Sequence, residues 1–105
     1  MLIRENLEID TAAISSNLKR ITNQIYKLLP NREENVDWKV PLNNILEELA
    51  GMDRLLFEQQ ELLFRIMCKL EGLFTLTGED DFPLYRKTIF ECLNLIGELL
   101  KQCQD

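Results

Sequence analysis

A leucine recurs at every seventh position through the middle of this 105-residue sequence. A second, mostly apolar line runs three residues behind it. Alternating steps of three and four place both lines on one face of a helix. This pattern predicts a helix over about 41–76, roughly 54 Å long if unbroken, with Pro41 in its first turn, where proline is well tolerated. The two lines are Leu42, Leu49, Leu56, Leu63 and Leu70, and Ile45, Met52, Gln59, Ile66 and Leu73.

Apolar residues at the same spacing predict a helix on each side of this segment. The first is expected over about 7–29, ended by Pro30, because proline has no backbone donor and disrupts a helix. The second is expected over about 82–103, after a turn containing Gly78 and with Pro83 near its start. Residues 30–40 form a connection between the first two helices. The seams are Leu7, Thr11, Ile14, Leu18, Ile21, Ile25 and Leu28, and Tyr85, Ile89, Cys92, Ile96, Leu99 and Cys103.

Residues 1–105 are therefore expected to form a single all-α domain, an antiparallel three-helix bundle with a long central helix. Gly51 and Gly72 mark the two likeliest break points of that helix, since each glycine costs about 1 kcal/mol against alanine. A break at either glycine would convert the chain into a four-helix bundle.

The middle segment is apolar over more of its circumference than a surface helix, whose apolar stripe is a little over ~100° wide. The flanking helices are too short to cover an unbroken helix of this length, and monomers rarely leave such patches bare. We therefore expect a homo-oligomer or a protein partner. The alternative is a compact monomer whose middle helix folds back on itself. The candidate interaction residues are Leu55, Leu56, Phe57, Leu62, Leu63 and Phe64.

Trp38 is the single tryptophan of the chain and lies in the connection before Pro41. One interpretation is a plug that covers the open end of the bundle. The other is a binding hot spot, because tryptophan is enriched at the centres of protein interfaces.

No residue pattern points to catalysis. The sequence contains no histidine, the commonest general base and metal ligand. Adjacent carboxylates on a helix point about 100° apart, so Glu47 and Glu48 do not form a catalytic pair. No phosphate-binding loop, dinucleotide fingerprint or calcium loop occurs. We expect neither an enzyme nor a bound cofactor or metal.

The net charge of −6 argues against direct nucleic-acid binding, because the twelve basic residues are scattered along the chain. No stretch approaches the eighteen or so apolar residues of a membrane span, and the N-terminus lacks a signal-peptide core. The spacing of Cys68, Cys92 and Cys103 matches no zinc or redox motif. Free thiols favour a reducing compartment, so we expect the cytoplasm of a cell or of an infected host.

Three functions fit these features. The first is a non-catalytic interaction or assembly protein that self-associates or docks through its long middle helix. The second is a small acidic inhibitor of the phage type that occupies the basic channel of a host enzyme. The third is a helical subunit of a nucleoprotein complex, held there by protein contacts.

The heptad pattern generates a direct test. Leu56→Asp or Leu63→Asp should unfold the chain or disperse its assembly, because an unpaired carboxylate in a leucine seam costs several kcal/mol. Glu58→Lys, on the polar face, should change the urea midpoint little. Equal tolerance of all three substitutions would show that the register is wrong.

Overall fold

The structure is a computed structural model that describes the backbone of residues 2–52 and 56–104 and the side chains of residues 12–52, 56 and 58–102. Within these ranges it is helical and has no strand, which confirms the all-α class. The elements, with η denoting a short 3-10 helix, are α1 (Leu2–Glu33), α2 (Lys39–Gly51), η1 (Phe57–Gln59), α3 (Gln60–Gly72), η2 (Leu73–Thr75), η3 (Glu79–Asp81) and α4 (Phe82–Gln104).

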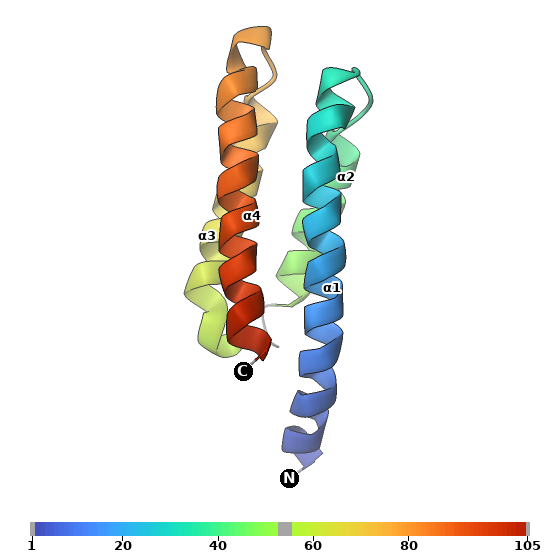
Figure 1. The fold of residues 1–105 in the computed structure, drawn as a ribbon, viewed down its shortest axis with the longest axis vertical. Coiled ribbons are helices and arrows are strands. Elements are labelled where there is room, and N and C mark those ends of the chain that lie inside the picture. Colours follow the sequence, from blue (N-terminus) through green and yellow to red (C-terminus); the bar gives the residue numbers. More distant parts are fainter. Residues whose placement is uncertain (1, 53–55, 105) are drawn as a thin grey trace.

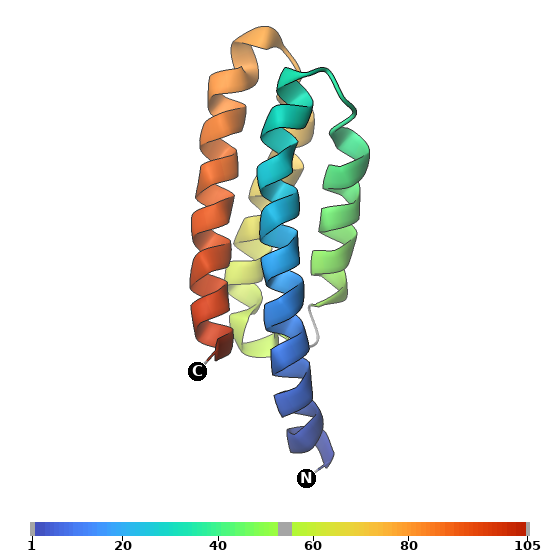
Figure 2. The same ribbon diagram turned by 45° about the vertical axis from the view of Figure 1, so that its right-hand side comes forward.

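The four α-helices of the described ranges lie side by side along the long axis, and consecutive helices run in opposite directions (Figure 1, Figure 2). The main contacts join α1 to α4 and α2, and α3 to α4 and α2. α1 and α4 form one broad face, and α2 and α3 lie behind them. The N-terminal turns of α1 extend beyond the other helices (Figure 2). No described helix is long and apolar enough to cross a bilayer.

The prediction of a single helix over 41–76 is wrong. α2 ends at Gly51, α3 begins at Gln60, and the two lie side by side with contacts between them. The Met52 N–H still donates to the Leu49 carbonyl at 3.1 Å, and the Leu56 N–H donates to the Met52 carbonyl at 3.0 Å. The chain therefore turns back just after the first of the two glycines that the sequence marks.

The turn allows α1 and α4 to cover the whole leucine line. Two helices of 13 residues are each about 20 Å long, so α1, of 32 residues, and α4, of 23 residues, can cover both. All five leucines of the repeat are at most 1% exposed. The bare ends of a long helix were the ground for expecting an oligomer, and the fold removes them. Self-association must therefore rest on other surfaces.

The expected end of the first helix at Pro30 is also wrong, since α1 continues to Glu33 with Pro30 inside it. Pro30 has no N–H to donate to the carbonyl of Tyr26, and its ring crowds that carbonyl. Both residues are solvent-exposed, so the carbonyl can tilt outward and accept from water instead. Asn35, just after the end of α1, has a left-handed φ of 59°. The Asn35 N–H donates to the Arg32 carbonyl and the Val36 N–H donates to the Asn31 carbonyl. This pair of bonds is the Schellman ending.

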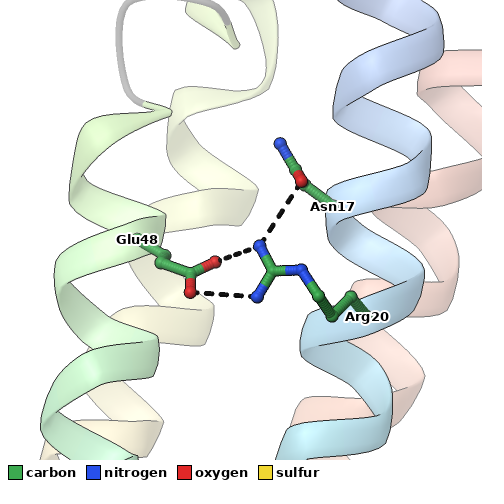
Figure 3. Close-up of polar contacts among 3 residues, drawn as sticks. All are labelled: Asn17, Arg20 and Glu48. Atoms are coloured by element: carbon green, nitrogen blue, oxygen red, sulfur yellow. Dashed lines mark hydrogen bonds and ion pairs between the residues drawn. The ribbon is translucent and has the colours of Figure 1, made fainter.

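A bidentate ion pair joins α1 to α2 (Figure 3). The Arg20 guanidinium donates to the two carboxylate oxygens of Glu48 at 3.0 and 2.6 Å, and to the Asn17 side chain at 3.4 Å. Hydrogen bonding from Arg20 lowers the pKa of Glu48. Because both side chains are more than a third exposed, solvent screens the pair and its main effect is on alignment.

Gly51→Ala tests whether the turn depends on glycine. The Gly51 φ is not positive, and a Cβ there would meet no atom within 4 Å. We expect the substitution to raise the free energy of unfolding by about 0.5–1 kcal/mol, measured by urea denaturation, with no change of shape.

Gly78→Ala is the matched control, because its Cβ would lie 3.2 Å from the Asp81 carboxylate and should bring no such gain. An increased hydrodynamic radius of the Gly51 variant would indicate a straightened helix and contradict the burial argument.

Candidate functional site

Two of the candidate interaction residues belong to the core. Leu56 and Leu63 are each 1% exposed and pack among the other seam residues. Their expected place on an interaction face is wrong, because the turn after Gly51 brings α1 and α4 over the leucine line. Leu62 is half-buried against the same core.

Phe64 remains at the surface, with 68% of the residue exposed. It is the candidate of the middle segment that the structure places in solvent. Leu55 and the side chain of Phe57 lie outside the described residues.

Trp38 covers the end of the molecule where the α1–α2 connection meets the start of α4. It is half-buried against the core, and its ring meets Tyr85 edge to face at 5.1 Å between centroids. Tyr85 also stacks with Phe82 at 6.2 Å. The plug interpretation therefore describes the packing of Trp38.

Arg32 connects several segments at the same end of the molecule. Its guanidinium lies 4.8 Å from the Tyr85 ring centroid and donates to the carbonyls of Leu76 and Gly78 at 2.8 and 2.7 Å. The buried Tyr85 hydroxyl donates to the Leu28 carbonyl at 3.3 Å. These contacts join α1 and α4 to the segment between η2 and η3, so the aromatic cluster and its arginine have a structural role.

An open hollow of about 700 Å³ lies beside Trp38. Its charged lining is mixed in sign, with Arg32 and Lys39 facing Glu33, Asp37 and Glu79. Asp37 is already engaged, since its carboxylate accepts from the backbone N–H groups that open α2. A lining of mixed sign favours no single class of ligand.

A second, more apolar groove is lined by residues of α2, α3 and η2, and α2 and α3 lie behind α1 and α4 (Figure 1). Its volume is about 480 Å³. Leu46 and Ala50 contribute from α2, Met67 contributes from α3, and Phe74 contributes from η2. Phe64 lies one turn before Met67 on the same side of the helix. The charged residues that line the groove are acidic. The full lining of the groove is Asn43, Leu46, Glu47, Ala50, Met67, Glu71 and Phe74.

The apolar part of this groove could be predicted from the sequence. Apolar residues beside the leucine lines made the middle segment unusually wide in its apolar face. Four of them, Leu46, Ala50, Met67 and Phe74, line this groove, and Phe64 lies one turn before Met67. Which flank stays open depends on the turn after Gly51, and the periodicity carries no information on that turn. The acidic rim of Glu47 and Glu71 was therefore missed.

The described thiols differ in environment. Cys92 is fully buried on the α4 seam, and this burial raises the pKa of its thiol to about 12, so it carries little thiolate. Cys68 is exposed on α3. The side chain of Cys103 lies outside the described residues.

No protein-family model matches this chain, and comparisons with curated proteins and with solved structures also found no match. The functional argument therefore rests on geometry and charge.

Because Tyr85 is buried, the stability of the fold should depend on pH in the alkaline range. Burial raises the pKa of Tyr85 from 10.0 to about 12. Between these two pH values the folded state therefore keeps the phenol proton, whereas the unfolded state has released it. Stability is fully present below pH 10 and should be lost as pH rises toward 12. In Tyr85→Phe the free energy of unfolding should fall less over this interval, as measured by urea denaturation. Tyr26→Phe, at a 55% exposed ring, is the control and should keep the wild-type slope.

Proposed function

We propose that this chain is a four-helix bundle that acts as a non-catalytic interaction or assembly protein in the cytoplasm of a cell or of an infected host. A protein partner binds in the α2–α3 groove. The observation that carries the proposal is an apolar groove of about 480 Å³, with the exposed Phe64 one turn away and carboxylates at its rim.

The lining of the groove suits a protein side chain better than a small polar ligand. Met67 is flexible and polarizable, so it adapts to different inserted groups. Phe74 and Leu46 provide fixed apolar walls, and each is already packed against the core. Each Å² of apolar surface that a partner buries here contributes about 25 cal/mol before association costs are subtracted. A partner that inserts aromatic or aliphatic groups gains most of this energy.

The rim selects the charge of that partner. Glu47 and Glu71 are exposed at the two walls, and the whole chain carries a net charge of −6. Complementary charges mainly accelerate encounter and exclude wrong partners. The expected partner therefore surrounds its apolar insert with lysine or arginine.

The groove is tested by the double variant Ala50→Arg with Phe64→Ser, two exposed positions whose substitution spares the core. Partners captured from the source cells with wild-type protein should be purified and their affinities measured. We expect at least a tenfold loss, equal to about 1.4 kcal/mol, because an aromatic anchor is removed and the groove is blocked.

Leu84→Ser is the control, since Leu84 is 52% exposed on α4, away from the groove, and should leave affinity unchanged. Equal affinity of wild-type and groove variants would contradict the proposal. Retained, salt-sensitive binding to a nucleic-acid enzyme would favour the inhibitor function instead.

A further inference from the structure

We propose that the occupant of the α2–α3 groove is the α1–α4 face of a second copy of this chain, so that copies stack front to back. This inference rests on the proposed function of the groove. It is carried by an exposed aromatic pair on the opposite face of the molecule and by the opposite charge of the two faces.

The aromatic pair consists of Tyr26 on α1 and Phe90 on α4. Their rings meet edge to face at 6.3 Å and 88°, and they are 55% and 37% exposed. The Arg86 guanidinium lies 5.3 Å from the Phe90 ring centroid. Tyrosine, phenylalanine and arginine are the residue types enriched in interface cores. This cluster matches the insert that the groove requires, an aromatic protrusion with a basic group beside it.

The charge around the pair is opposite to that of the groove. Lys19 lies two turns before Tyr26 on the same side of α1, and Lys87 lies one turn before Phe90 on α4. Glu33, two turns after Tyr26, is the acidic residue on that line. The groove carries Glu47 and Glu71. A basic face therefore meets an acidic one when copies stack.

The two surfaces also lie at the same level along the molecule. Lys69 and Glu91 form an ion pair at 3.4 Å between α3 and α4. Glu91 is next to Phe90, and Lys69 lies between the groove residues Met67 and Glu71. Because α1 and α4 lie in front of α2 and α3 in the view down the shortest axis (Figure 1), a shift of one copy along that axis, over which the molecule extends 18 Å, brings its aromatic pair toward the groove of the next.

This geometry favours front-to-back stacking over the alternatives. Pairing groove with groove opposes Glu47 and Glu71 to like charges, and pairing the α1–α4 faces opposes Arg86 and Lys87 to like charges. Nucleic acid needs open ring faces for base stacking, whereas the Phe90 ring already lies under Arg86 and makes an edge-to-face contact with Tyr26. A front-to-back contact is heterologous, so it adds copies without closing at a dimer unless a rotation forms a ring.

The test is charge exchange followed by sedimentation velocity. One variant carries Arg86→Glu and Lys87→Glu, and the other carries Glu47→Lys and Glu71→Lys. The wild-type mass should exceed twice 12.4 kDa as its concentration rises from about 10 µM to about 1 mM, where small interfaces associate. Each variant alone should stay monomeric, because its two faces then carry the same sign. An equimolar mixture should assemble again, since every contact between unlike copies is complementary.

A control with Lys27→Glu and Arg65→Glu makes the same change of net charge as Arg86→Glu with Lys87→Glu, at exposed positions outside both surfaces, and it should assemble like the wild type. Circular dichroism of every variant checks that the helices persist.

A wild-type monomer at about 1 mM would overturn the inference. Undiminished assembly of either charge-exchanged variant alone would also overturn it, because that result indicates a symmetric contact. If the wild type is monomeric while the groove variant Ala50→Arg with Phe64→Ser still loses a captured partner, the second copy is excluded and the proposed function stands. If neither effect is seen, both fail.

Discussion

Burial of the leucine seam in the middle of the chain is the constraint on which the rest of the structure depends. A continuous helix would carry that seam beyond the reach of its neighbours, leaving apolar surface at both ends. The turn between Met52 and Leu56 removes this cost by giving each half two covering helices. Met52 and Leu56 are both buried, so the line of buried seam residues continues across the point where the helix breaks. The order of helices around the core and the groove behind α2 and α3 follow from that single reversal.

The periodicity of the sequence predicted which residues are buried better than it predicted how they are connected. The described seam residues are buried except Gln59, which is half-buried, because a step of three or four selects the same side of a helix in either topology. Continuity is a different property. It depends on whether neighbouring helices can cover the whole length, which is a comparison between distant segments. Pro30 shows the same limit, since its cost depends on whether the carbonyl of Tyr26 faces water.

The candidate site was less accessible to sequence reasoning for the same reason. Phe64 could be identified because a large aromatic beside a leucine line stands out in the sequence. Leu56 and Leu63 were misplaced because a seam residue looks the same whether its partner belongs to the same chain or to another. The Tyr26–Phe90 pair joins residues 64 positions apart, and no local pattern relates them. Its detection requires knowing that α1 and α4 are neighbours.

Net charge and local charge lead to different expectations for this protein. A value of −6 suggests copies that repel one another, and the scattered basic residues suggest no cationic face. The fold places Arg86 and Lys87 beside one aromatic pair, with Lys19 and Glu33 each two turns from Tyr26, and leaves Glu47 and Glu71 on the other side. At about 0.15 M salt the Debye length is about 8 Å, which is less than the 18 Å thickness of the molecule. An approaching surface therefore responds mainly to the face in front of it, so the separation of charge between the two faces matters more for association than their sum.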